Sequence, residues 1–78
     1  MEDWKERLKA EYAQTKERYE KLKAYNNKQE VAAYLLDDNV AENPEDIYSR
    51  ILLKKQQSAM GEYLHILELR AELHHIEL

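Results

Sequence analysis

The sequence predicts an all-α fold, a helical hairpin with a short connector helix that assembles with copies of itself into an oligomeric helical bundle. Its 78 residues include one glycine and one proline, and Glu, Lys, Leu, Ala and Gln are abundant. Those five residue types are strong helix formers. Two long stretches repeat apolar side chains every three or four residues, and an acidic segment separates them. A single domain over residues 1–78 is therefore expected.

The first helix is predicted over residues of about 2–25. Acidic side chains occupy its first turn, where their negative charge interacts favourably with the positive end of the helix dipole. Asn26 and Asn27 are expected to end it, because Asn tolerates the left-handed conformation found at helix ends. Its length would be roughly 36 Å. One seam with the 4-3 spacing of a coiled coil runs along it: Leu8, Tyr12, Thr15, Tyr19 and Leu22.

The connector is predicted over residues 26–43. The apolar run 31–36 is long enough for one or two helical turns, and Asp37, Asp38 and Asn39 then interrupt the pattern. We expect this short helix to fold Tyr34 and Leu35 onto the hairpin.

The second helix is predicted over residues 44–77. Asn43 is a preferred N-cap residue, Pro44 suits the first helical position, and acidic residues follow in the first turn. No breaker follows before the end of the sequence, so the helix would be roughly 50 Å long. It is expected to extend roughly 15 Å beyond the first helix, with a projecting tail from Glu72 onward.

Two neighbouring apolar seams on the second helix predict self-association. A single partner helix cannot cover both, and soluble monomers rarely expose a contiguous apolar patch. Coverage of one seam by the connector is the alternative. The seams are Leu52, Gln56, Ala59, Tyr63, Ile66, Arg70 and Leu73, and Leu53, Gln57, Met60, Leu64, Leu67, Ala71, His74 and Leu78.

Charge and composition exclude several classes of function. The net charge is −4; residues 1–28 carry eight bases and six acids, residues 29–49 carry six acids and no base, and residues 50–78 carry four of each. DNA or RNA binding needs concentrated positive charge, so neither is expected. There is no cysteine, no apolar stretch of membrane-spanning length and no signal-peptide pattern at the start. A cytoplasmic protein without a membrane partner is expected.

Few residues suggest catalysis or metal binding. Glu72 and His75 have the Glu-x-x-His spacing of helical di-metal proteins. The pair falls in the predicted projecting tail, so no metal site is expected. No Cys or Ser lies in a nucleophile context and there is no Gly-rich phosphate loop, so no cofactor and no enzymatic activity are expected. Gly61 lies inside the second helix, where it costs about 1 kcal/mol relative to Ala. It indicates either a close helix crossing or room for a ligand.

The sequence has six tyrosines, one tryptophan and no phenylalanine. Tyrosine suits a partly wet binding wall, because its ring is apolar and its tip polar. A cation beside a ring suits a nucleotide, which offers a phosphate and a base. The same pattern is also typical of an ordinary amphipathic rim. The candidate ligand-binding residues are Tyr12, Lys16, Tyr19, Arg50, Lys54 and Tyr63.

The sequence resembles the small helical-hairpin proteins of temperate and crAss-like bacteriophages. Residues 7–25 resemble the first half of that group, and residues 52–67, with Leu52-Leu53, Ala59-Met60 and Tyr63-Leu64, resemble the second. The resemblance implies a phage origin, a helical hairpin and no known enzymatic activity. Other small oligomeric phage proteins act as sponges for cyclic nucleotides or cyclic ADP-ribose signals of bacterial immunity.

The resemblance favours a non-enzymatic anti-defence sponge in the host cytosol. It would sequester a nucleotide-derived immune signal between the helices of a homo-oligomer. The alternative is a helical inhibitor or adaptor that binds a host protein through the apolar seams.

Overall fold

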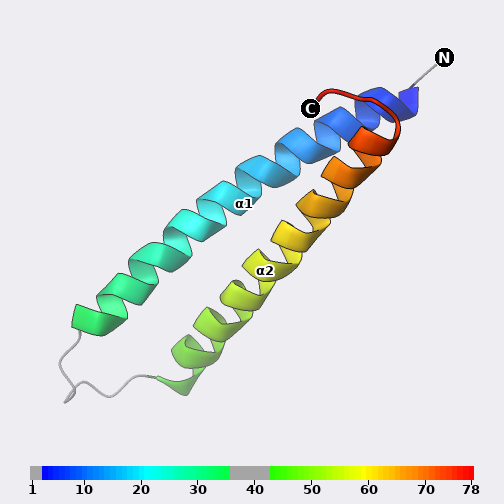
Figure 1. Cartoon of the computed structure of the whole chain (residues 1–78). Helices are drawn as coiled ribbons and strands as arrows, with labels where there is room; N and C mark the ends of the chain where they lie inside the picture. Colours follow the sequence, from blue (N-terminus) through cyan, green and yellow to red (C-terminus); the bar gives the residue numbers. More distant parts are fainter. Residues whose placement is uncertain (1–2, 36–42) are drawn as a thin grey trace.

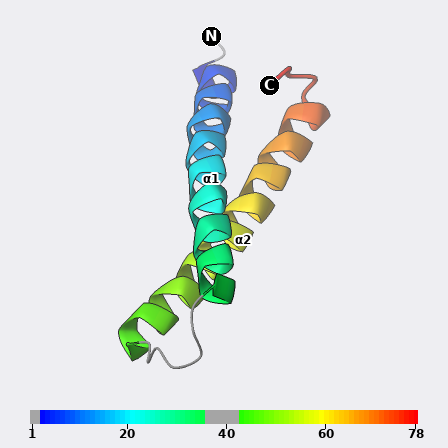
Figure 2. The ribbon, with the colours of Figure 1, turned by 90° about the vertical axis from the view of Figure 1, so that its left-hand side faces the viewer.

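The computed structural model describes residues 3–35 and 43–78 and shows a hairpin of two long helices. Helix α1 spans Asp3–Leu35 and helix α2 spans Pro44–Leu73. They run antiparallel and side by side, so the two ends of the chain lie at the same end of the molecule (Figure 1). The molecule measures 61 × 19 × 16 Å. The helices are inclined to each other (Figure 2). The predicted helical hairpin is confirmed.

Helix α1 ends ten residues later than predicted. It continues through Asn26 and Asn27 to Leu35, so the predicted helix end was wrong and the first part of the connector belongs to α1. The expectation that Tyr34 and Leu35 fold onto the hairpin was also wrong, since they are 80% and 81% exposed. The remainder of the predicted connector, residues 36–42, lies outside the described residues.

The two helices meet along matching seams with coiled-coil spacing. Among the described residues, the buried and half-buried positions in the body of each helix recur every three or four residues. On α1 they are Lys5, Leu8, Tyr12, Thr15, Tyr19, Leu22, Asn26 and Gln29; on α2 they are Arg50, Leu53, Gln57, Met60, Gly61, Leu64, Leu67 and Ala71. The seam that follows Leu53 therefore faces α1.

The apolar core is small and lies toward the end of the hairpin that carries the chain termini. Leu8, Leu67 and Ala71 form a buried cluster, and Tyr12 and Ile76 pack against it. Toward the other end the seam becomes polar. A core of this size gives limited stability by itself, because hydrophobic stabilisation grows with the apolar area buried.

Asn26 explains why α1 does not end where the Asn pair predicts. Its side chain is 5% exposed. The amide Nδ2 donates to the backbone oxygen of Leu53 at 3.1 Å and to Oε1 of Gln57 at 2.8 Å. These bonds across the seam reward a helical Asn26, and tertiary contacts of this kind override weak intrinsic propensity.

The start of α2 agrees with the prediction. Asn43 is its N-cap, and Oδ1 of that residue accepts from the backbone N–H of Glu45 at 2.9 Å. Pro44 occupies the first turn, as the sequence predicts.

The end of α2 differs from the prediction, because the helix stops at Leu73 and its tail folds back. His75 is left-handed, with φ 56°, and the backbone N–H of Ile76 donates to the oxygen of Ala71 at 2.8 Å. Together with a bond from His75 N–H to the oxygen of Glu72 at 3.2 Å, this is a Schellman motif. Ile76 thereby covers the buried cluster. The predicted projecting tail, and the predicted excess length of α2, were wrong.

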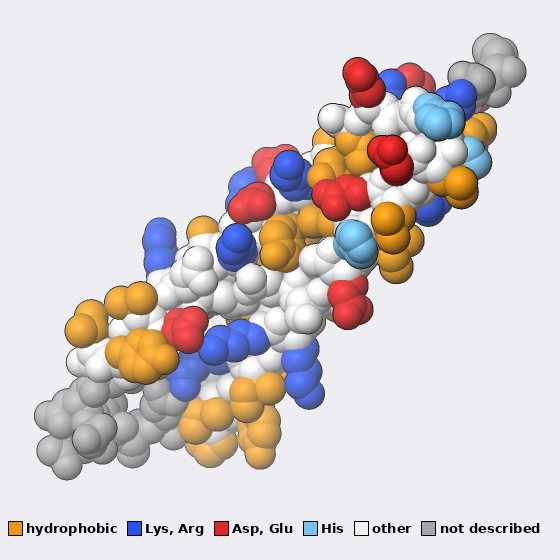
Figure 3. All heavy atoms as spheres, in the orientation of Figure 1, with side chains coloured by type: hydrophobic (Ala, Val, Ile, Leu, Met, Phe, Trp, Pro, Cys, Tyr) orange, Lys and Arg blue, Asp and Glu red, His pale blue; other side chains and the backbone are white. Residues whose placement is uncertain are grey.

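The other predicted seam of α2 lies in solvent. Leu52, Tyr63, Ile66 and Leu73 are 64%, 39%, 53% and 72% exposed. We call this exposed stripe the outer seam. Figure 3 shows one face of the molecule, where apolar side chains lie at the surface of both helices among charged ones.

Candidate ligand-binding groove

Three hollows follow one another along one side of the helix pair. The first and second share Asn26, Glu30 and Lys54, and the second and third share Tyr19 and Gly61. Because consecutive hollows share lining residues, they form one continuous depression, which we call the groove. Both helices contribute side chains to it along its length.

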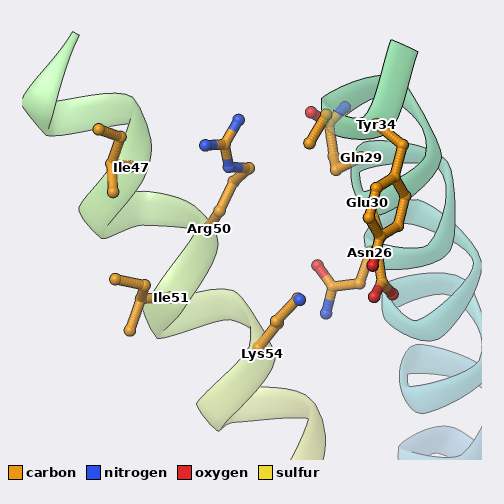
Figure 4. A pocket seen from close by; sticks show the side chains of 9 residues that line it. Asn26, Gln29, Glu30, Tyr34, Ile47, Arg50, Ile51 and Lys54 are labelled. Atoms are coloured by element: carbon orange, nitrogen blue, oxygen red, sulfur yellow. The ribbon is translucent and has the colours of Figure 1, made fainter. Parts of the chain in front are cut away.

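The hollow nearest the link between the helices, called the link end, has a volume of about 300 Å³. Figure 4 shows Arg50 and Lys54 reaching from α2 toward α1, where Asn26, Glu30 and Tyr34 lie. Ala33, Ile47 and Ile51 supply apolar surface to the same hollow. The described residues thus bring two cations, one carboxylate, amides and one aromatic ring to this hollow, and its volume is at the lower end for small-molecule sites.

The middle of the groove is set by Gly61. A Cβ placed on this residue would lie 3.3 Å from Cε1 of Tyr19. The absence of a side chain therefore lets the Tyr19 ring lie directly against the backbone of α2. The close-crossing interpretation of Gly61 holds within the hairpin, and the residue also lines the groove.

The third hollow, called the core end, is lined by a hydrogen-bonded cluster. The hydroxyl of Tyr12 donates to Oε2 of Glu68 at 2.7 Å, and Nδ1 of His65 lies 3.9 Å from Oε1 of the same carboxylate. The Nζ of Lys16 lies 5.7 Å from the centroid of the Tyr12 ring. The hydrogen bond to Glu68, helped by partial burial and by the negative charge of that carboxylate, raises the pKa of Tyr12 above 10.0.

Five of the six predicted ligand-binding residues line the groove, at two separate places. Tyr12, Lys16 and Tyr19 lie at its core end, whereas Arg50 and Lys54 lie at its link end. The sixth, Tyr63, is on the outer seam and lines none of these three hollows. The structure therefore does not join all six in one pocket.

Sequence reasoning missed three residues of the link end: Asn26, Glu30 and Tyr34. Asn26 carried a readable signal, because it follows Leu22 by four residues and so continues the seam of α1. Glu30 and Tyr34 follow at four-residue intervals, which places them on the same side of a helix. Ending the helix at the Asn pair hid this alignment.

The histidines do not form a metal site within the described part of the chain. There, no three His, Cys, Asp or Glu side chains gather closely enough to hold a metal ion. The ring of His74 instead meets Trp4 edge to face, with centroids 4.9 Å apart. Over residues 3–35 and 43–78, neither helix has the length and apolarity needed to cross a bilayer.

Comparison with family models gives one match that covers most of the chain. The Sequestin model matches residues 2–73. The chain belongs to the Sequestin family. The match includes both helices and every residue of the groove. Comparison with curated proteins and with solved structures gave no match. The family name points to sequestration of a small ligand.

Proposed function

We propose that this member of the Sequestin family is a phage-encoded anti-defence sponge. It binds a nucleotide-derived immune signal, of the cyclic nucleotide or cyclic ADP-ribose type, in the cytosol of the infected host. The protein is not an enzyme in this proposal, because sequestration requires affinity and a high protein concentration but no chemical step.

The groove is the observation that carries the proposal. Three tyrosines and three cations line it: Tyr12, Tyr19, Tyr34, Lys16, Arg50 and Lys54. Rings offer stacking surfaces to bases, and the cations attract phosphate oxygens. The family name supports the same function from an independent direction.

Self-association completes the proposed sponge. A bound small molecule usually buries most of its surface, but a groove between two helices leaves the outward side of the ligand exposed. The outer seam offers apolar surface for a second hairpin, with Leu52, Ala59 and Ile66 seven residues apart. Packing through this seam would form a bundle of four or more helices with several equal grooves.

A second candidate function rests on the same exposed seam. An amphipathic helix face can bind a groove of another protein through side chains spaced by three and four residues. In that case the chain would inhibit or adapt a host protein, and the groove would be incidental.

A thermal-shift screen separates the two. The purified protein is heated with a panel of cyclic mononucleotides, cyclic dinucleotides and cyclic ADP-ribose isomers. Ligand at about 100 times its dissociation constant stabilises by about 2.7 kcal/mol, which raises the melting temperature of a chain of this size by roughly 10–20 °C. A shift with one class supports the sponge. No shift across the panel, with recovery of a stoichiometric host protein, supports the inhibitor.

A further inference from the structure

Two opposite charges interrupt the apolar outer side of α2. Lys55 lies three residues after Leu52, and its side chain is exposed; Glu62 is likewise exposed. It lies four residues before Ile66, so both charges share the side of the helix that carries the outer seam. No Asp or Glu stands three or four positions from Lys55, and no Lys or Arg stands so close to Glu62. Over residues 3–35 and 43–78, neither side chain forms an ion pair.

Large apolar side chains flank the two charges, and a small one separates them. Ala59 lies four residues after Lys55 and three before Glu62. Read in reverse, this pattern keeps its apolar ends and exchanges its two charges. Such a surface is complementary to its own reversed copy, as a twofold symmetric contact requires. The flanking side chains, between 53% and 72% exposed, are Tyr48 and Leu52 before the charges and Ile66, Leu69 and Leu73 after them.

The charges select the direction of a second copy. If the two α2 helices ran parallel and in register, Lys55 would face Lys55 and Glu62 would face Glu62. Antiparallel helices instead bring Lys55 of each copy near Glu62 of the other. Like charges in a contact oppose association and opposite charges favour it, so the pair selects the antiparallel direction.

The apolar side chains select the register. When two antiparallel α2 helices meet in layers with 4-3 spacing, Leu52 lies opposite Leu69 and Tyr48 lies opposite Leu73. The opposite charges of the two copies are then about 6 Å apart along the helices, a distance that a lysine side chain spans. A shift by one heptad in one direction places Leu52 opposite a carboxylate. A shift in the other direction leaves Leu52 and Tyr48 beyond the end of the second α2.

We infer that two copies of this chain pair through the outer sides of their α2 helices, antiparallel and in this register, with two Lys55–Glu62 ion pairs beside the twofold axis. The inference rests on the self-association in the proposed function and adds its direction, its register and the residues that select them. The contact gives each hairpin apolar burial that its small core lacks.

The arrangement determines where the two grooves open. The twofold axis that relates antiparallel helices runs perpendicular to both, so a feature on one side of the first hairpin recurs on the same side of the second. Both grooves therefore open on one face of the dimer, with the link end of each level with the core end of the other. A parallel dimer would turn the grooves to opposite faces.

Charge reversal tests the ion pairs. Lys55→Glu and Glu62→Lys should each raise the dissociation constant of the dimer at least about tenfold, because two attractive pairs become repulsive. The double variant Lys55→Glu/Glu62→Lys restores opposite charges and should restore the native constant. Sedimentation equilibrium measures all three. Lys28→Glu makes the same change at an exposed position of α1 and should have no effect.

Three results of this experiment overturn the inference. One is a double variant that dissociates as readily as the single variants. Another is single variants with the native constant, since in a parallel dimer each reversal only exchanges one like-charged pair for another. The third is a native chain that is a monomer at micromolar concentration.

Disulfide crosslinking reports the direction and the register, because the chain has no cysteine of its own. Leu52→Cys and Leu69→Cys change exposed side chains, so both variants should fold. An equal mixture of the two should form a disulfide dimer on oxidation. Neither variant should crosslink alone, since its two copies of the cysteine lie roughly 26 Å apart along the antiparallel helices. Crosslinking of Leu52→Cys alone as fast as the mixture indicates a parallel dimer and overturns the inference.

These outcomes are distinguishable from failure of the proposed function. A ligand shift in the thermal-shift panel, beside a parallel crosslink, overturns the inference and leaves the sponge standing. The expected crosslink with no shift across the panel supports the dimer and overturns the sponge.

Discussion

At the scale of single residues, one buried amide joins the two helices where the seam is polar. Asn26 donates both to a backbone oxygen and to Gln57, and each bond exists only when α1 and α2 are in this register. A polar residue at one seam position often fixes register in coiled coils. Asn26 therefore aligns the link end of the groove, which it also lines.

Replacement of Asn26 by Ala should destabilise the hairpin by about 1–3 kcal/mol, because it leaves a buried acceptor without its donor. Chemical denaturation at a fixed protein concentration measures the change. Asn27→Ala is the matched control, since Asn27 is exposed, and it should change the free energy of unfolding by less than about 0.5 kcal/mol. Equal effects of the two substitutions would show that the bonds across the seam contribute nothing.

The bond from Tyr12 to Glu68 makes the stability of the folded chain depend on pH. Its pKa is raised in the folded state, so folding favours the protonated hydroxyl. The stabilisation is complete below the unfolded pKa of about 10 and is lost as pH rises through the higher folded pKa. Tyr12→Phe removes this contribution. We therefore expect stability to fall less steeply above pH 10 in Tyr12→Phe than in the native chain. Parallel slopes in urea unfolding at pH 9 to 11 would contradict the bond to Glu68.

At the scale of the helices, the end of α2 is a strained turn that brings Ile76 onto the core. His75 adopts φ 56°, which costs a residue with a side chain about 1–2 kcal/mol and costs glycine far less. The Schellman bonds and the contact of Ile76 with the buried cluster offset that cost.

His75→Gly should therefore raise the free energy of unfolding by about 1 kcal/mol, or the melting temperature by about 4–8 °C. His65→Gly, in the helical part of α2, should lower stability by a similar amount. Differential scanning calorimetry measures both. A melting temperature that falls in His75→Gly would mean that the chain does not turn at this residue.

Comparison of sequence with structure shows which features of α1 and α2 can be predicted. The 4-3 spacing predicts both helices and two apolar seams on α2, because burial follows apolar periodicity, but it does not predict which seam faces α1. The cap at Asn43 predicts the start of α2. The ends of both helices escape prediction, because Asn26 is rewarded by contacts across the seam and His75 takes a conformation usual for glycine. These depend on tertiary structure, which local signals do not contain.

The candidate site was also predictable only in part from the sequence. Residue type and position predict that Lys54 and Tyr19 contact a ligand, and both line the groove. Which cation accompanies which tyrosine depends on the register of the two antiparallel helices, which the sequence analysis did not predict. The separation of the candidate residues into two ends of the groove is visible only in the structure.

At the scale of the whole molecule, the hairpin buries little and exposes a regular apolar stripe. Four hydrophobic residues of the described chain are buried, whereas Ile66 and Leu73 are more than half exposed. Small domains of this kind gain stability by association. We therefore expect light scattering coupled to size exclusion to give a multiple of the chain mass of 9.4 kDa.

Ile66→Glu places a charge in the centre of the outer seam and should shift this mass toward 9.4 kDa. Gln14→Glu introduces the same carboxylate on an exposed position of α1, away from the outer seam, and should keep the native mass. A native protein that elutes as a monomer at micromolar concentration would contradict association through the outer seam.

The central claim is that the chain captures a nucleotide-derived signal without altering it. The most direct measurement incubates excess protein with the molecule that gives a shift in the thermal-shift panel. The protein with its bound ligand is separated by filtration and heated, and the mass of the released molecule is determined by mass spectrometry. The account predicts a filtrate depleted of the signal and quantitative release of the unchanged molecule on heating. Release of a hydrolysed product, or a filtrate that keeps the full amount of signal, would contradict it.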